Sequence, residues 1–512
     1  MKLNRLLLMS VMGLGLFACN NNDLVEGSGP EGTQTEGTTY VGLKINFNSS
    51  SSRATGDQPV DGDGTTTPPL YNDAEEGNED VIHDVRIVVT DAEGNIQFNK
   101  VVTANATNNK LYTFQTTPGM KTFYAIVNGE ALNITGLNAT SGTWNPQIVV
   151  NKTASELAKY EASSEEEGFT YDTDKGFLMS SVEAVEQPIQ SEVTEEQVLN
   201  DKLNNVAITV ERVVAKVTMS VSNDVNLQGD FTLKELTCQI GNADNFQYNK
   251  NGGENKYTST GTYLMAWNDN NVRKTNYYDY PTSNTADFWT GFTQTSLLGS
   301  DTYTLYQNGT ASNKARFYCL ENTHGQGNYL FGNTTFVRVK ATMTPKKTIT
   351  FTAADDNITI EDGSEPTNPE TFYQVTAAPI ESAKGAYVLA SDLLNAYTTI
   401  VTGGSETGDN EKISAVITTL KSKGYQFTDA YEGGCGYYNV WVNDLKENNQ
   451  FLNLAPVFRN DWYDLTIKSL TLPGSANPDD GNPGDQIHPD TYVGVTLTVR
   501  NWNKVNHNIV LQ

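Results

Sequence analysis

The sequence predicts a mainly β protein, and three features of its pattern support this. Short runs of β-branched and aromatic residues recur along the chain, Gly, Asn and Asp separate them, and helical spacing is rare. Such runs are typical of an antiparallel β architecture. Because 512 residues exceed what one hydrophobic core usually serves, we expect two folded domains.

The N-terminus has the order of a lipoprotein signal peptide. Lys2 and Arg5 supply positive charge, an apolar run follows, and Leu16-Phe-Ala-Cys19 ends it with a cysteine. The apolar run is about 12 residues long, whereas a membrane-spanning helix needs roughly 20. We therefore expect residues 1–19 to be the signal peptide of an outer-membrane lipoprotein precursor, with Cys19 lipidated.

Residues 20–53 are predicted to be a propeptide that contains a tether and one strand. The tether, from Asn20 to Thr38, is rich in Asn, Gly, Glu and Thr. From Thr39 onward apolar residues alternate with others, which is typical of a half-buried strand. This alternation places four side chains on one face: Val41, Leu43, Ile45 and Phe47.

A second polar segment, residues 48–80, contains Arg53, the only arginine between Arg5 and Arg86. A single arginine in a loop rich in Ser and Gly is where a trypsin-like protease would cut. We expect cleavage between Arg53 and Ala54. This cut would remove the lipid, the tether and the first strand together.

Two β-rich stretches follow, and we assign residues 54–211 to an N-terminal domain and residues 212–472 to a C-terminal domain. The strand-like runs are residues 85–90, 122–127, 206–210, 213–221, 336–343, 440–442 and 465–472. Helical spacing is limited to residues 154–162, 195–203 and 411–421. We expect these few helices to be satellites of the sheets.

The C-terminal end repeats the first strand. Residues 473–490 carry four prolines among Gly and Asp, which excludes strand and helix and predicts a linker. The last piece, residues 491–512, begins Thr-Tyr-Val-Gly, as does the strand at Thr39, and then alternates in the same way. Its inward-facing residues are Val493, Val495, Leu497 and Val499.

This duplication suggests that two strands fill one groove in turn, although chance similarity between two short strands is the alternative. Cleavage would empty the groove, and the last strand of a neighbouring molecule could then enter it by strand addition. Four buried aliphatic side chains would contribute about 6–12 kcal/mol. A linker of about 17 residues reaches some 50 Å, and head-to-tail insertion that does not close produces a filament.

Several further segments carry a family resemblance: Val210–Val217, Tyr318–Thr323, Phe458–Ile467 and Trp502 after the last strand. Together with the lipoprotein signal and Arg53, they resemble the fimbrillins of the Bacteroidales, or type V pilins, and among these the stalk pilins of short, Mfa-type fimbriae. The resemblance implies two transthyretin-like β-sandwich domains, an arginine-specific protease, and donor-strand polymerisation with copies of itself at the cell surface.

The resemblance also implies accessory anchor and tip subunits as partners, and host or bacterial surface receptors. Anchor subunits of this family keep their lipid, and tip subunits differ at the C-terminus. Because this chain has both Arg53 and a C-terminal donor strand, it fits the stalk, the major subunit of a fimbria that supports adhesion.

Other chemistry is sparse. The four histidines show no metal-ligand spacing, and neither a GxSxG motif nor a phosphate-binding loop is present, so we predict no catalytic residue, no metal and no cofactor. A net charge of −27 argues against nucleic acid as a partner. Cys238, Cys319 and Cys435 remain after Cys19; one disulfide could form among them, but they do not describe a disulfide framework.

Two other functions stay open at this point. The chain contains 25 Tyr, 19 Phe and 6 Trp, which could stack on sugars in a glycan-binding lipoprotein of the outer membrane. A fimbrial tip adhesin is the other alternative. A monomeric glycan binder has no need of Arg53 or of the repeated strand, which therefore favour the polymerising subunit.

Overall fold

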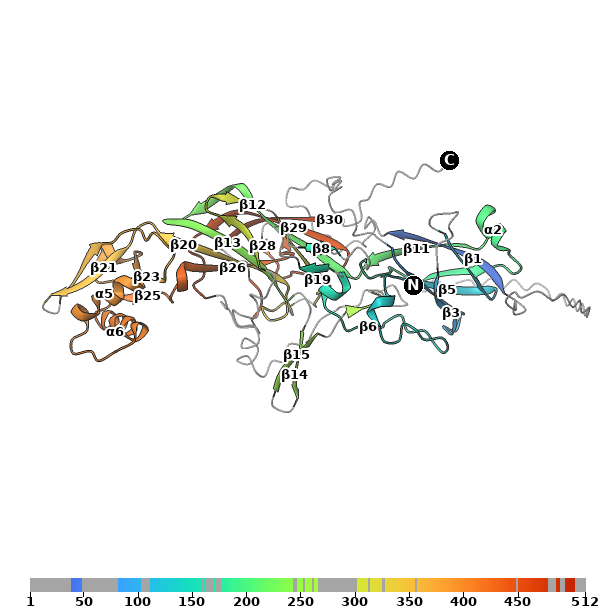
Figure 1. Cartoon of the computed structure of the whole chain (residues 1–512), viewed down its shortest axis with the longest axis horizontal. Helices are drawn as coiled ribbons and strands as arrows, with labels where there is room; N and C mark the ends of the chain where they lie inside the picture. The colour runs from blue at the N-terminus through green and yellow to red at the C-terminus, as the bar shows by residue number, and fades with distance from the viewer. Residues whose placement is uncertain are drawn as a thin grey trace, which may run out of the picture.

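The computed structural model describes residues 38–47, 82–102, 111–477, 485–488 and 493–501. Within the third range, it leaves out residues 159, 163–168, 172–175, 243–245, 252–253, 260–261, 266–301, 312–313, 325–326, 355–356 and 448–449. The molecule is elongated, with an N-terminal sheet, a central pair of sheets and a small helical module in a row (Figure 1). The mainly β prediction is confirmed.

The N-terminal part is an eight-stranded sheet with the order β3-β2-β5-β9-β11-β1-β4, in which β10 pairs with β5. Its strands are β1 (Thr39–Phe47), β2 (Val85–Thr90), β3 (Ile96–Val102), β4 (Leu111–Thr116), β5 (Gly119–Val127), β9 (Met179–Ser181), β10 (Val185–Ile189) and β11 (Asn205–Arg212). The sheet curls until its end strands meet, because the rings of Phe98 on β3 and Phe114 on β4 lie 4.6 Å apart. The curled sheet encloses the first hydrophobic core.

The C-terminal part is a sandwich of two sheets that share one core. One sheet has the order β19-β12-β29-β30 and the other β18-β17-β13-β20-β26. The bounds are β12 (Val214–Gln228), β13 (Phe231–Gly241), β17 (Tyr303–Gln307), β18 (Thr310–Ala311), β19 (Ala315–Leu320), β20 (Phe336–Pro345), β26 (Cys435–Trp441), β29 (Asp461–Thr471) and β30 (Val493–Asn501). Alternating residues of both sheets, such as Val217 and Val339, meet between them.

The chain passes from one part to the other at Val213. Strand β11 ends at Arg212 and β12 begins at Val214. A later segment then returns to the N-terminal part, where β16 (Thr262–Tyr263) pairs with β6 (Val149–Val150). Leu264 and Met265 are buried in the N-terminal core. The two parts therefore share packing at their junction.

A buried ion pair strengthens this junction. Arg459 and Glu321 are both 0% exposed, and Arg459 Nε donates to Glu321 Oε2 at 2.8 Å. The same guanidinium donates to the carbonyl oxygens of Tyr263 and Leu264 at 2.6 and 3.0 Å and to Thr262 Oγ1 at 3.0 Å. One side chain thus holds the returning segment against the C-terminal sandwich.

We expect Arg459→Met to lower the free energy of unfolding by about 3–5 kcal/mol, because Glu321 would stay buried without its partner. Urea denaturation of the full chain measures the change. The double variant Arg459→Met with Glu321→Gln removes both charges and should recover part of the loss. Equal stability of the wild type and Arg459→Met would show that the pair does not stabilise the junction.

A module that the sequence did not predict lies between the paired strands β20 and β26, at the far end from the N-terminal sheet (Figure 1). It contains β21 (Ile349–Ala354), β22 (Asn357–Asp362), β23 (Phe372–Ala377), β24 (Tyr387–Leu389), β25 (Gln426–Phe427) and the helices α5 (Ala390–Ile400) and α6 (Asp409–Ser422). Leu393, Val416 and Phe351 belong to its separate core. Helix α6 matches the expected helix at residues 411–421, whereas α5 was missed.

The other expected helices are shorter than the pattern suggests. Helix α1 ends at Ala158, and Tyr160–Ala162 form strand β7 instead. Helix α2 spans Glu195–Asn200, with Thr194 as its N-cap in a capping box with Gln197. The remaining short elements are α1 (Ala154–Ala158), β8 (Phe169–Tyr171), β14 (Phe246–Asn251), β15 (Glu254–Ser259), β27 (Lys446–Glu447), β28 (Gln450–Phe451), η1 (Glu130–Leu132), η2 (Glu381–Ala383) and η3 (Glu432–Gly434).

Candidate functional site

Strand β1 lies inside the N-terminal sheet, between two neighbours from distant parts of the chain. It runs parallel to β11 along Gly42–Phe47 and antiparallel to β4 along Thr39–Lys44. Val41, Leu43 and Ile45 are buried in the N-terminal core. Phe47 is part of the strand and is paired with Val210 in register; its side chain is outside the described residues.

Removal of β1 would therefore leave a groove with two open walls. The facing edges of β11 and β4 would lose their backbone partners, and the pockets of Val41, Leu43 and Ile45 would lose their apolar contents. A strand inserted there would gain main-chain hydrogen bonds on both sides and bury alternate side chains. We call this space the β1 groove.

The outer face of β1 is covered close to Gly42. Residues 190–205, which we call the strap, connect β10 to β11 and contain helix α2. Val198 of α2 is fully buried, and Thr113 Oγ1 on β4 donates to Glu195 Oε1 at 2.6 Å. Because the strap starts beside β11 and is bonded to β4, it crosses over β1 close to Gly42.

The beginning of β1 is held by polar contacts to the strap. Thr39 is 1% exposed; its Oγ1 donates to the carbonyl oxygen of Gln190 at 2.8 Å and accepts from the backbone N–H of Val193 at 3.0 Å. The Nδ2 of Asn204 donates to the carbonyl oxygen of Tyr40 at 3.0 Å. The N–H of Gly42 donates to the carbonyl oxygen of Asn204 at 3.2 Å.

The repeated strand forms β30 and lies on the C-terminal sheet of its own chain. It pairs antiparallel with β29, with Val495 opposite Ile467 and Leu497 opposite Leu465. Val495 and Leu497 are half-buried against the C-terminal core. Val493 and Val499 belong to the strand, and their side chains are outside the described residues. Among the described residues, β30 pairs with β29 alone.

The predicted linker has contacts of its own where the structure describes it, at residues 473–477 and 485–488. Ser475 exchanges backbone hydrogen bonds with Tyr437, and Ile487 is buried among the aromatic residues of a small cluster. Trp441 Nε1 donates to the carbonyl oxygen of His488 at 2.7 Å. These portions are neither strand nor helix, and they lie against the sandwich.

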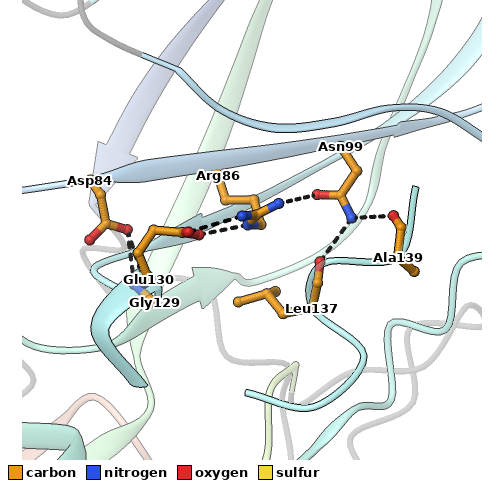
Figure 2. A network of polar contacts seen from close by, with 7 residues as sticks. All are labelled: Asp84, Arg86, Asn99, Gly129, Glu130, Leu137 and Ala139. Atoms are coloured by element: carbon orange, nitrogen blue, oxygen red, sulfur yellow. Dashed lines mark hydrogen bonds and ion pairs between the residues drawn. The ribbon is translucent and has the colours of Figure 1, made fainter. Parts of the chain in front are cut away.

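Cys19, Arg53 and Ala54 lie outside the described residues. The next arginine, Arg86 on β2, is shown in Figure 2. Its Nε and Nη2 donate to the two carboxylate oxygens of Glu130 at 2.7 and 3.0 Å, and its Nη1 donates to Asn99 Oδ1 at 2.9 Å. Asn99 Nδ2 in turn donates to the carbonyl oxygens of Leu137 and Ala139, so Arg86 is enclosed by a bonded network.

The described part of the chain offers little other chemistry. Cys238, Cys319 and Cys435 are buried there and form no disulfide with one another. No group of three or more His, Cys, Asp or Glu residues within it is arranged to hold a metal ion. Of its helices, none combines the length and the apolar character that crossing a bilayer requires.

The sequence predicted the inward face of β1 and missed two features of the strand, one on each face. Gly42 lies under the strap, and Thr39 is a buried polar anchor rather than an ordinary strand residue. The signal for both was present, because Thr-Tyr-Val-Gly is identical at residues 39–42 and 491–494. Only the alternation that follows it was used as an indication of packing.

Comparison with known proteins finds similarity to fimbrial subunits. Residues 429–508 match the family described as major fimbrial subunit protein type IV, fimbrillin, C-terminal. The chain is 23% identical to the minor fimbrium subunit Mfa1 of Porphyromonas gingivalis over 512 residues, covering 96% of this chain and 90% of that protein. A second Mfa1 sequence from the same organism matches with the same identity and coverage.

Solved structures of fimbrial proteins also align with most of the chain. A fimbrilin, FimA of Porphyromonas gingivalis, covers 91% of this chain and 97% of its own, with 15% identity and a TM-score of 0.39. The tip fimbrial protein Mfa3 of the same organism covers 91% and 100%, with 13% identity and a TM-score of 0.33. The C-terminal family match and the similarity to Mfa1 show that the chain resembles fimbrial subunits of the Bacteroidales fimbrillin type, a family of structural proteins rather than enzymes.

Proposed function

We propose that this chain is the polymerising stalk subunit of a surface fimbria and that its subunits join by donor-strand exchange. The observation that carries the proposal is the position of β1. It is an interior strand that belongs to the predicted propeptide, and its sequence recurs at the other end of the chain. Cleavage after Arg53 would separate β1 from the body and let it leave the groove.

The exchange is favourable because the β1 groove buries the side chains of the incoming strand more fully than the resting place of β30 does, and because it provides two pairing strands instead of one. At rest β30 pairs with β29, and Val495 and Leu497 are only half-buried. In the groove these residues would take the places of Leu43 and Ile45, which are buried, between two pairing strands. Each fully buried aliphatic side chain is worth about 1.5–3 kcal/mol relative to exposure, less the cost of ordering the tail.

Donation requires β30 and its docked linker to leave their own sandwich first. The antiparallel ladder to β29 and the contacts of Ile487 and His488 oppose this release. They keep the tail on its own subunit until an empty groove is available. An unprocessed precursor could not accept a tail, because β1 still fills its groove.

The environment of the arginines supports cleavage at Arg53. Of the arginines whose side chains the structure describes, Arg86, Arg212, Arg338 and Arg459 are buried and Arg316 is half-buried, whereas a protease needs an extended, accessible segment. Arg86 is further held by Glu130 and Asn99 (Figure 2). Arg53 lies in a segment rich in Ser and Gly, a composition typical of the loops that proteases cut.

The placement of aromatic residues favours this function over glycan binding. Trp144, Trp441 and Trp462, the tryptophans within the described residues, are all buried. Buried rings pack in cores and cannot stack on a sugar.

The C-terminal donor copy favours a stalk position over a tip position, because a terminal subunit has no neighbour to which it must donate. Export as a lipoprotein through Cys19 is part of the same proposal.

We expect Arg53→Ala to yield a folded precursor that does not polymerise, because β1 stays in the groove. The measurement is an SDS ladder of surface-sheared protein, with N-terminal sequencing of the subunit. Arg53→Lys is the matched control: a protease that accepts lysine should restore both cleavage and ladders, and an arginine-specific one should not. Ladders of normal length from Arg53→Ala would refute cleavage at this position as the trigger.

A further inference from the structure

Alternation of apolar residues cannot by itself fix the register of the incoming strand. A strand shifted by two residues keeps the same face toward the core, because side-chain direction repeats every second residue. The tail could therefore enter the β1 groove in several registers that all bury aliphatic side chains. A second feature must select one of them.

We propose that the strap reads the tetrapeptide Thr-Tyr-Val-Gly of the incoming tail, and that Gly494 in the place of Gly42 sets the register. This inference rests on the proposed donor-strand exchange and names the residues that make the exchange specific. The occupant is the tail of a second copy of this chain, whose residues 491–494 repeat residues 39–42 in the same order.

The space at Gly42 admits no side chain. A Cβ placed there would lie 2.6 Å from Val198 Cγ1 and 3.2 Å from Leu111 Cδ1, and it would also collide with Asn205 Oδ1. Gly42 is not among the glycines with positive φ, so its requirement is space rather than backbone conformation. Asn205 Oδ1 is buried without a hydrogen-bond partner within the described residues, so the firmer restraint on this space is Val198, a fully buried residue of helix α2.

Only one residue of the tail fits this space. The residues of 491–501 that share the outward face with Gly494 are Tyr492, Thr496, Thr498 and Arg500. All four carry a Cβ. A shift of two residues in either direction would bring Tyr492 or Thr496 against Val198 and Asn205. The strap thus rejects each shifted register that the core face would accept.

Thr491 would supply the polar half of the same recognition. In the Thr39 position its hydroxyl would donate to the carbonyl oxygen of Gln190 and accept from the N–H of Val193, as Thr39 does. In a shifted register, the buried N–H of Val193 would lose this acceptor, which is costly, and the carbonyl oxygen of Gln190 would keep only its bond from Asn204 Nδ2. A tail with alternating aliphatic residues but without Thr and Gly at this spacing would collide at the Gly42 position and lose the hydrogen bonds of the Thr39 position. The strap therefore favours tails that carry the same tetrapeptide as this chain.

The test compares cleaved Gly494→Ala subunits with cleaved Thr496→Ala subunits in ladder formation. Thr496 would take the place of Lys44, whose side chain is exposed, so its truncation should have no effect. We expect Gly494→Ala to bind a neighbour's groove about 10- to 100-fold more weakly, as is typical of overpacking. Adding Val198→Ala and Asn205→Ala to the same chain removes the colliding atoms and should restore the ladders.

An engineered disulfide measures the register of the inserted strand. Lys44 is opposite Ala207 on β11, so Thr496→Cys and Ala207→Cys on two subunits should cross-link in the wild-type register. Dimers from cleaved subunits that carry this pair should be cross-linked, and Gly494→Ala in the same background should reduce the yield. Equal ladders and equal cross-linking with and without Gly494→Ala would overturn the proposal while leaving donor-strand exchange intact.

The space at Gly42 can also be tested without polymerisation. Gly→Ala in an open strand position usually raises stability slightly. In the uncleaved precursor, we expect Gly42→Ala to lower the melting temperature instead, with recovery on adding Val198→Ala and Asn205→Ala. A higher melting temperature for Gly42→Ala would refute the steric selection. Absence of ladders from cleaved wild-type subunits would refute the proposed exchange. It would also refute the selection of a neighbour's tail by the strap.

Discussion

A precursor that carries Lys44→Cys and Ala207→Cys should fail to polymerise after cleavage while it is oxidised, and should polymerise once it is reduced. Lys44 and Ala207 are partners in the parallel pairing of β1 with β11, and both side chains are exposed. Adjacent strand positions lie within the distance a disulfide can bridge. The bond would tether β1 in its groove even when the chain has been cut after Arg53.

The expected effect is complete loss of ladders under oxidising conditions, because a tethered strand competes with any incoming tail at a very high effective concentration. SDS ladders of cleaved protein with and without reductant measure it. Thr352→Cys with Thr359→Cys is the matched control, since this pair joins β21 to β22 on the exposed surface of the far module. Ladders of normal length from the oxidised Lys44→Cys/Ala207→Cys protein would show that β1 need not leave for subunits to join.

Val495→Asp should abolish polymerisation, and Thr496→Asp should leave it intact. In the register set by the tetrapeptide, Val495 takes the place of Leu43, which is 0% exposed, and Thr496 takes the place of exposed Lys44. Burying an unpaired carboxylate costs several kcal/mol. A penalty of about 4 kcal/mol weakens the joint roughly a thousandfold.

The resting position of the tail strengthens this comparison. Val495 is half-buried against its own sandwich, so Val495→Asp also weakens the docking of β30 and makes the tail easier to release. Loss of polymerisation would therefore report on entry into the neighbour's groove. The assay mixes cleaved subunits and counts ladder rungs over time. Equal polymerisation of the two variants would refute the alternation as the basis of donor binding.

Much of the fold could be predicted from local patterns. The alternation at Thr39–Phe47 predicted a strand with Val41, Leu43 and Ile45 inside, and the structure buries all three. Period-2 alternation is a local property that directly states which face of a strand is apolar, so these features need no knowledge of the neighbours.

The sequence pattern indicates the helical module only weakly. Helix α5 has Leu389 as its N-cap, which makes no side-chain capping bond, and its last turn contains Thr-Thr-Ile. Such residues favour strands and weaken a helical signal. Its buried residues, Leu393, Ala396 and Ile400, pack in the separate module core with α6 and β21. Tertiary packing stabilises a helix here that intrinsic propensity does not indicate.

The sequence by itself determined the strand faces, the repeat of Thr-Tyr-Val-Gly, the single arginine of the polar segment and the absence of recognisable catalytic motifs. Only the tertiary structure decided that β1 lies between β11 and β4, that the strap crosses it at Gly42, and that β30 rests on β29. The physical reason is that alternation specifies a buried face but not the strands that pair with it. Those partners are distant in sequence, and the space beside Gly42 exists only once β4, β11 and α2 have come together around it.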